Sequence, residues 1–291
     1  MKIPASDGQT THIPVAAIAL RLWISCAVFG SMVVFGWMGA DILRQGVSEL
    51  SWSFLIEAPL RSGLEGGIAP FLVSTGLVLT CAMVVATPIS IALSLFLVER
   101  LSFEGVLAKF LRATLMLLTG VPSIVFGLVG ASLLGDVLGF GASILTGGLT
   151  LAAMIIPTFV FAMVEILRLL PQQYRFAGVA LGAVPVTVVI RVVLRIIRPG
   201  ILGAFLLSAG RALGETAALI FTSGYSDRMP TSLFDSGRVL SIHILDLAMN
   251  IPGGEPRAAA TAIALMALFL LFSGGVALLG TNFGVGGTYI E

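Results

Sequence analysis

The apolar positions of this chain form long uninterrupted runs rather than an alternating pattern. Five runs without a charged residue each reach the roughly 18 to 20 residues that a helix needs to cross a bilayer. A sixth, residues 199–225, is equally apolar except for Arg211 and Glu215. Lipid offers no water to backbone N–H and C=O groups, so the predicted fold class is all-α with six membrane spans. The five uncharged runs are residues 22–40, 66–98, 113–135, 137–164 and 258–290.

Composition agrees with a polytopic membrane protein. Hydrophobic residues make up 57% of the 291 residues and charged residues only 11%, against about 25% charged in soluble domains. The expected surroundings are therefore a lipid membrane. A net charge of +1 gives no basic field that would attract nucleic acid, so no nucleic-acid partner is expected. Cys26 and Cys81 both lie inside predicted spans, which favours apolar packing and leaves a disulfide open.

The distribution of Lys and Arg predicts the orientation. Residues 1–21, 99–112 and 168–198 hold ten basic residues, whereas residues 40–69, 135–143 and 226–257 hold five. Because cytoplasmic loops carry the excess of basic residues, both termini are predicted to be cytoplasmic. Residues 1–15 then form a cytoplasmic tail, and residues 16–39 are expected to be a retained first span rather than a cleaved signal peptide.

Arg211 and Glu215 are the candidate functional residues within a span. They lie four residues apart, which would place them on one helical face. Opposite charges in a lipid-length segment normally face a protein interior or a water-filled path and mark a functional site. The alternative, that the two charges only neutralise each other and fix helix packing, stays open.

Two spans contain helix-breaking clusters. Proline removes a backbone donor and favours a kink, and glycine allows close approach of another backbone. Irregular backbone at membrane depth is tolerated where helices pack closely or where it lines a cavity, so close packing and a moving or pore-lining segment are both possible. The candidate structural or gating residues are Gly66, Gly67, Pro70, Pro88, Gly120, Pro122, Ser123 and Gly127.

Two loops have a recognisable pattern. In the inside loop, residues 172–183 predict a short helix rich in small side chains that ends near Gly182 or Pro185. Residues 186–197 carry arginines at helical spacing against Val and Ile and suit a helix in the headgroup region. In the outside loop 224–257, residues 232–250 predict an interfacial helix or a partner-contacting cap. His243 in this segment and His12 in the N-terminal tail are each expected to be a polar surface or interface residue.

Several kinds of chemistry find no support in the sequence. The chain has no GxxxxGK[ST] motif, and its only lysines are Lys2 and Lys109, so nothing is expected to cradle nucleotide phosphates. It has no HExxH motif and no clustered Cys or His spacing, so no metal is expected. No histidine lies at membrane depth beside a serine, as a hydrolase would need. The chain is therefore expected not to be an enzyme and to bind no cofactor.

Four motifs together resemble a known family. RALGETA at 211–217, GVPSIVFG at 120–127, GGIAP at 66–70 and FAGVALGA at 176–183 are similar to the inner-membrane permease subunits of phosphate-specific ABC importers. The PstA type is closer than the PstC type, because Ala217 follows GET and GGIAP opens the second span. The resemblance implies an ABC importer permease fold over residues 16–291.

The resemblance also implies roles and partners. Phosphate would pass at Arg211, Glu215 and Thr216. The loop 168–198 would hold the coupling helix, in which Phe176, Ala177 and Gly178 occupy the EAA positions of the superfamily motif, Gly182 matches and Arg195 replaces its proline. The expected partners are a second permease or a second copy, cytoplasmic subunits that bind the ATP, and a periplasmic or extracellular phosphate-binding protein. The implied ATPase-coupling residues are Arg175, Phe176, Ala177, Gly178, Ala180, Leu181 and Gly182.

Two other functions remain open from the sequence. A permease for phosphonate, sulfate or molybdate could carry the same arginine, because the guanidinium fork suits any such oxyanion. A secondary transporter or channel would work without an ATPase, but such carriers often have two related halves, and no clear internal repeat is visible here.

Overall fold

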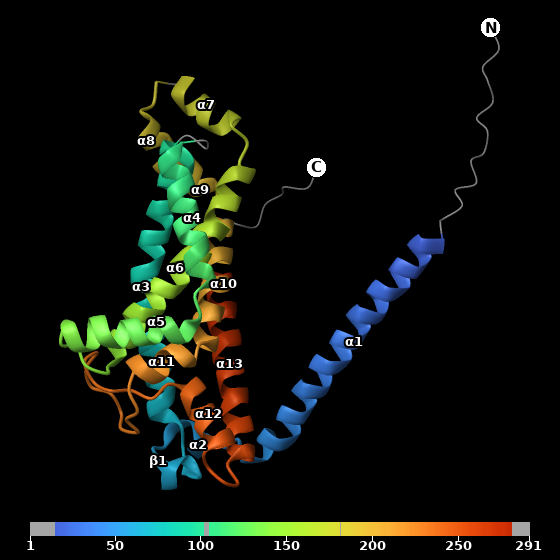
Figure 1. Cartoon of the computed structure of the whole chain (residues 1–291), viewed down its shortest axis with the longest axis vertical. Coiled ribbons are helices and arrows are strands. Elements are labelled where there is room, and N and C mark those ends of the chain that lie inside the picture. The colour runs from blue at the N-terminus through green and yellow to red at the C-terminus, as the bar shows by residue number, and fades with distance from the viewer. Residues whose placement is uncertain (1–14, 102–104, 181, 281–291) are drawn as a thin grey trace.

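The computed structural model describes residues 15–101, 105–180 and 182–280 and is almost entirely helical (Figure 1). Within these ranges, four helices are long and apolar enough to cross a membrane, and two bent helix pairs bring the number of spans to as many as six. The all-α prediction is therefore confirmed. The four long helices are α1 (Val15–Gly46), α3 (Ala69–Leu95), α6 (Ile144–Leu169) and α13 (Glu255–Gly280).

The centre of the bundle is the packing of α3 against α6. Ala82 and Ala86 of α3 and Ile155 and Phe159 of α6 are completely buried in one cluster. α6 begins at Ile144 because the Ser143 hydroxyl accepts a hydrogen bond from the Thr146 N–H at 3.2 Å, an N-cap interaction. The fourth predicted span, 137–164, thus starts later and ends later than expected. α3 ends in a π-helical turn, η3 (Phe96–Arg100).

The third predicted span is not one helix, which corrects the prediction for residues 113–135. α4 (Val106–Gly120) ends, and the chain turns by 99° into α5 (Ser123–Gly130) and η4 (Ala131–Val137). Pro122 causes the break, because it has no N–H to donate and because it disfavours the helical conformation for Val121, which is extended. α5 then crosses the bundle beside α11 (Figure 1).

The predicted span 199–225 is also interrupted. α8 (Pro185–Val188), η5 (Val189–Val193) and α9 (Leu194–Ile196) precede α10 (Arg198–Gly214), and the chain bends by 70° between them. α10 ends at Gly214, and a separate helix, α11 (Ala217–Thr222), follows. Before this bend, α7 (Gln173–Ala180) confirms the predicted short helix, and Gly182 has a φ of +77°, as expected just after a helix end.

α7 and α8 lie at one end of the molecule, here called the α7 end, and the opposite end is called the α12 end (Figure 1). The α12 end holds α12 (Leu240–Met249), the short helices η1 (Val47–Glu49), α2 (Trp52–Ile56) and η2 (Arg61–Gly63), and the antiparallel pair β1 (Pro59–Leu60) and β2 (Glu65–Gly66). α12 begins at Leu240, later than the predicted residue 232, and buries Leu240, Ile242 and Leu247. It packs against α13 and α3 along this buried side.

α1 is attached to the bundle near its last residue and diverges from it elsewhere (Figure 1). A Cβ at Gly46 would lie 2.6 Å from the Ala260 nitrogen of α13, and Glu49 forms an ion pair with Arg257 at 3.0 Å. Trp23, with 72% of its surface exposed, is one of many large apolar side chains that α1 exposes. A helix that is apolar all round requires lipid or another protein around it. The tail before residue 15 and the predicted end of the last span after residue 280 lie outside the described residues.

Candidate functional site

Arg211 lies on the last turn of α10 and contacts two other side chains. Its Nη1 donates a hydrogen bond of 2.7 Å to the Thr158 hydroxyl of α6, and its Nε lies 3.9 Å from a carboxylate oxygen of Glu215. About a third of the arginine side chain, 36%, is exposed. A cation at a helix C-terminus is stabilised by the unpaired carbonyls of the last turn. The sequence therefore folds a guanidinium into a position where α10 itself favours the positive charge.

Glu215 and Thr216 form the break between α10 and α11. Glu215 has extended backbone angles (φ −77°, ψ 129°), and its carbonyl accepts a hydrogen bond from the Ser241 hydroxyl of α12 at 2.9 Å. Thr216 precedes α11 as its N-cap. The prediction that Arg211 and Glu215 share one helical face is wrong, because the helix ends between them. They nevertheless meet, since the extended residue returns the carboxylate towards the guanidinium.

The geometry leaves the guanidinium incompletely bonded. A separation of 3.9 Å between Nε and the carboxylate is an ion pair but too long for a hydrogen bond. Of the five N–H donors of an arginine, one is directed to Thr158. A planar, partly exposed guanidinium with donors to spare can bind a tetrahedral oxyanion through paired hydrogen bonds.

The GVPSIVFG segment reaches α11 through Gly127, just after the α10–α11 break. Gly127 of α5 lies so close to α11 that an added Cβ would stand 2.8 Å from the Ala218 Cα. Gly120 ends α4 with open space around it, and Pro122 and Ser123 form the turn into α5. Pro88 lies on an exposed position inside α3, whose helix continues through it. The structure thus brings the α5 segment, but not Pro88, to the candidate site.

The GGIAP segment lies at the α12 end, away from this break. Gly66 has a φ of +73° and pairs with Pro59 across the two strands, and its carbonyl accepts a hydrogen bond from Arg257 at 2.7 Å. An added Cβ on Gly67 would lie 2.6 Å from the Glu57 carbonyl oxygen. Pro70 is buried in the first turn of α3, where proline is tolerated. These residues join the start of α3 to the α2 segment.

The predicted coupling residues lie on and just after α7, and they face in two directions. Phe176 is 66% exposed, and Ala177, Ala180 and Gly182 are also exposed. Arg175 instead turns inward to Glu99, with N–O distances of 2.8 to 3.1 Å. Gly178 packs on α8, where an added Cβ would lie 2.6 Å from a Val188 methyl carbon. Leu181 lies outside the described residues.

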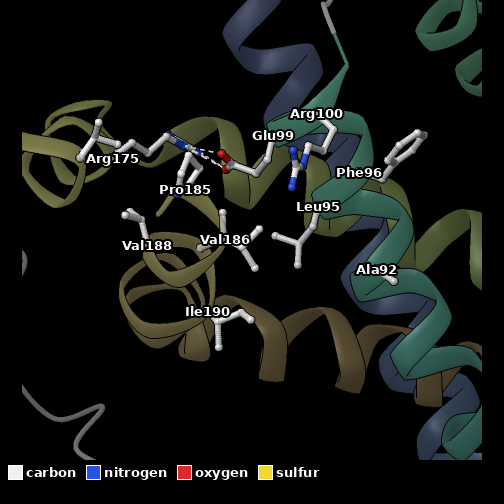
Figure 2. A pocket seen from close by; sticks show the side chains of 12 residues that line it. Ala92, Leu95, Phe96, Glu99, Arg100, Arg175, Pro185, Val186, Val188 and Ile190 are labelled. Carbon is white, nitrogen blue, oxygen red and sulfur yellow. Dashed lines mark hydrogen bonds and ion pairs between the residues drawn. The ribbon is translucent and has the colours of Figure 1, made fainter. Parts of the chain in front are cut away.

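A cavity of about 400 Å³ opens beside this segment (Figure 2). Its walls come from the end of α3, from α7 and from the α8–η5 segment. Most of its lining is apolar, and the Glu99–Arg175 ion pair closes one side of it (Figure 2). The cavity therefore separates α7 from the end of α3 except where this ion pair joins them.

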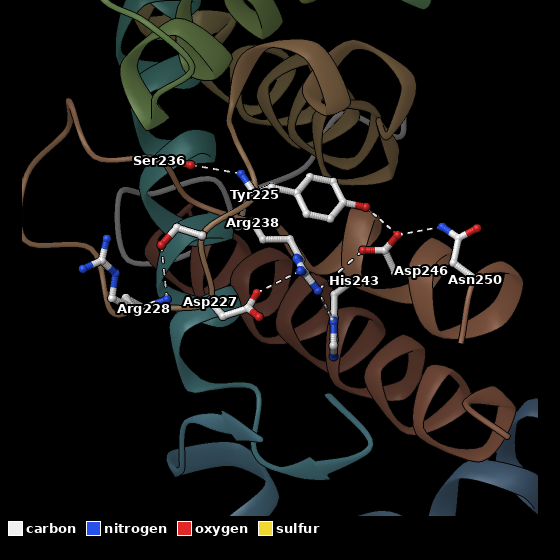
Figure 3. A network of polar contacts seen from close by, with 9 residues as sticks. Tyr225, Asp227, Arg228, Ser236, Arg238, His243, Asp246 and Asn250 are labelled. Atoms are coloured by element: carbon white, nitrogen blue, oxygen red, sulfur yellow. Dashed lines mark hydrogen bonds and ion pairs between the residues drawn. The ribbon is translucent and has the colours of Figure 1, made fainter. Parts of the chain in front are cut away.

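A polar network organises the α12 end (Figure 3). Arg238, with 7% exposure, pairs with Asp227 at 2.9 Å and with Asp246 at 3.5 Å, and it lies over the Tyr225 ring. The Tyr225 hydroxyl donates to Asp246, and burial together with this hydrogen bond raises the pKa of Tyr225 to about 12. Buried charges are costly unless they are paired in this way.

His243 belongs to the same network, which corrects its predicted surface location. It is 1% exposed, and its ring lies 4.1 Å from the Phe71 ring, centroid to centroid. Burial, reinforced by the nearby Arg238, lowers the pKa of His243 to about 3. The ring is neutral at ordinary pH and acts as part of the core. Among the described residues, no group of His, Cys, Asp or Glu could hold a metal ion.

Sequence reasoning missed two residues that the structure brings to these sites. Thr158 is a hydroxyl at the middle of a span, directly after Pro157, and that position was its only signal. Glu99 was visible as the first charge after the long apolar run 66–98. Neither pairing has a sequence signal, because Thr158 and Glu99 lie 53 and 76 residues from their partners.

The long apolar helices and the charged break define a polytopic helical membrane protein. Residues 86–283 match the family described as "Binding-protein-dependent transport system inner membrane component". The chain belongs to this family.

Individual relatives agree with this assignment. The chain is 32% identical to "Phosphate transport system permease protein PstA 1" of Mycobacterium tuberculosis (strain CDC 1551 / Oshkosh), over 81% of this chain and 73% of the relative. It is 29% identical to "Phosphate transport system permease protein PstC" of Haemophilus influenzae, over 90% and 87%. It is 27% identical to "Probable ABC transporter permease protein YqgI" of Bacillus subtilis, over 91% and 94%. The predicted resemblance to PstA-type permeases is confirmed.

Proposed function

We propose that this permease carries inorganic phosphate inward across the membrane, with Arg211 as the transient anion ligand. The observation that carries the proposal is the incomplete bonding of its guanidinium, which has one hydrogen bond to Thr158 and an ion pair 3.9 Å long to Glu215. The names of the PstA and PstC relatives support phosphate as the anion. Thr216, at the same break, is proposed to line the path.

Glu215 is proposed to regulate how long phosphate stays. Its carboxylate competes with the anion for Arg211, so it compensates the guanidinium when the path is empty and weakens the bound state when phosphate arrives. A transport site must bind well enough to admit its substrate and weakly enough to release it. The break between α10 and α11 keeps the carboxylate near, but not bonded to, the guanidinium.

The proposed assembly contains a second permease or a second copy, cytoplasmic ATP-binding subunits and an external phosphate-binding protein. The excess of basic residues in loops 1–21, 99–112 and 168–198 supports cytoplasmic termini and a cytoplasmic α7 end. The exposed side of α7, with Phe176 and Ala177, is then available to the ATPase as a helix-in-groove contact. This chain would supply no ATPase site of its own.

The test is uptake of labelled phosphate by the full complex in liposomes, with ATP and the binding protein. We expect Arg211→Ala to abolish uptake while the complex still assembles, and Arg198→Ala, an exposed arginine at the start of the same helix, to leave it unchanged. Sulfate and molybdate as competitors would reveal a different oxyanion. Normal uptake by Arg211→Ala would overturn the proposal.

A further inference from the structure

We infer that Arg175 is a positioning residue that joins the coupling helix α7 to the core helices α3 and α6, rather than a contact for the ATPase. This inference rests on the proposed function, in which α7 receives the movement of the ATPase. It concerns one set of contacts, here called the clasp: the Arg175 guanidinium, the Glu99 carboxylate and the carbonyls of Leu167 and Leu170.

In the clasp, the Arg175 guanidinium donates hydrogen bonds both to a carboxylate and to backbone carbonyls. Nε and one Nη bond to Glu99 at 2.8 to 3.1 Å, and the two Nη atoms also donate to the Leu167 and Leu170 carbonyls, each at 3.1 Å. The side chains of Arg175 and Glu99 are only 22% and 14% exposed. Four of the five N–H donors of this guanidinium are therefore bonded within the chain, which leaves few for a partner protein.

The clasp joins three elements: the π-helical turn η3, the C-terminal end of α6 and the short helix α7. Glu99 lies on η3, the π-helical end of α3, and such turns are frequent at functional sites. Leu167 and Leu170 belong to the C-terminal end of α6, where carbonyls have no partner within the helix and a cation is favoured. Arg175 thus satisfies the end of α6 while it pairs with α3.

The clasp is also the bridge across the cavity beside α7 (Figure 2). Away from the cavity, Phe176 is 66% exposed, and Ala177 and Ala180 are also exposed. α7 therefore has an outward apolar side that suits a partner and an inward charged contact that holds it to the bundle. A force applied to the outward side reaches α3 and α6 through Arg175.

The same α6 helix reaches the candidate anion site. Thr158, the hydrogen-bond partner of Arg211, lies nine residues before Leu167, which is about 14 Å along the helix axis. Phe159 and Met163 between these points, and Leu167 itself, are completely buried, and a close-packed interior transmits strain. The contacts run from α7 through the clasp and α6 to Arg211.

Two readouts test the clasp in the full complex: phosphate imported per ATP hydrolysed, and hydrogen exchange of the α7 amides without nucleotide. The variants are Glu99→Gln and Arg175→Gln. The matched control is Glu165→Gln, since Glu165 lies near the same end of α6 and its ion pair with Arg168, at 3.6 Å, is largely exposed. Arg175→Lys keeps the charge but not the fork and should give intermediate values.

For both clasp variants we expect import per ATP to fall about fivefold or more while ATP hydrolysis stays within about twofold of the unmodified complex. The α7 amides should exchange about tenfold faster. In the variants, α7 can open locally without the free-energy cost of breaking the clasp. Unchanged α7 exchange, or import and hydrolysis falling in the same proportion, would overturn the inference. If the unmodified complex imports no phosphate, the proposed function fails, and α7 exchange still decides whether the clasp exists.

Discussion

The Arg211 guanidinium of α10 donates a 2.7 Å hydrogen bond to the Thr158 hydroxyl of α6, across two helices that are far apart in the sequence. The bond fixes one edge of the guanidinium and leaves the other edge near Glu215. An arginine side chain is otherwise long and flexible, so this hydroxyl orients the candidate anion ligand in the bundle.

Replacing Thr158 tests that orientation. Thr158→Val keeps the shape but removes the acceptor, and we expect the KM for phosphate uptake to rise severalfold with a stability loss of about 1 kcal/mol. Thr114→Val is the matched control, because the Thr114 hydroxyl bonds only to a carbonyl of its own helix at 3.0 Å. An unchanged KM in Thr158→Val would show that the hydroxyl does not orient Arg211.

Neutralising Glu215 tests the competition for the guanidinium. In Glu215→Gln the side chain keeps its size but no longer attracts the positive charge, so phosphate should bind more tightly and leave more slowly. We expect KM and kcat for uptake both to fall, measured with the reconstituted complex. A higher KM would instead mean that Glu215 helps to bind phosphate.

Gly127 tests the packing of α5 on α11. Gly127→Ala places a methyl group 2.8 Å from the Ala218 Cα, and the resulting shift should destabilise the protein by about 1 to 3 kcal/mol. Gly120→Ala, in the neighbouring helix with nothing within 4 Å, should be neutral or slightly stabilising. The melting temperature in detergent distinguishes the two, and equal melting temperatures would contradict the close packing.

His243 predicts a pH dependence of stability. Its pKa is about 3 in the folded protein and about 6.5 when unfolded. Between these values only the unfolded chain takes up the proton, so stability is complete above pH 6.5 and declines as the pH falls, by about 2 kcal/mol at pH 5.

The measurement is the melting temperature at several pH values for the unmodified protein and for His243→Gln. The variant should be less stable at neutral pH, because it loses the Phe71 contact. Its melting temperature should change less with pH between pH 6.5 and 5 than that of the unmodified protein. Equal slopes would mean that another group causes the dependence.

The sequence by itself determined that this protein is built of membrane-length helices and that one of the apolar runs carries a charged pair. Runs of apolar residues long enough for a bilayer dictate helices wherever backbone groups have no water, and the charges at 211 and 215 stand out in such a run. The small-residue helix at α7 and its terminating Gly182 followed from local propensity alone. These features depend on neighbours within a few positions, so periodicity and composition are sufficient to find them.

Only the tertiary structure decided which residues meet. The 99° turn at Pro122, the break that removes Glu215 from α10, and the burial of His243 depend on what packs against each segment. The pairs Arg175–Glu99 and Arg211–Thr158 join distant positions. Their formation depends on how α3, α6, α7 and α10 pack, and a one-dimensional pattern contains no signal for contacts between separate helices.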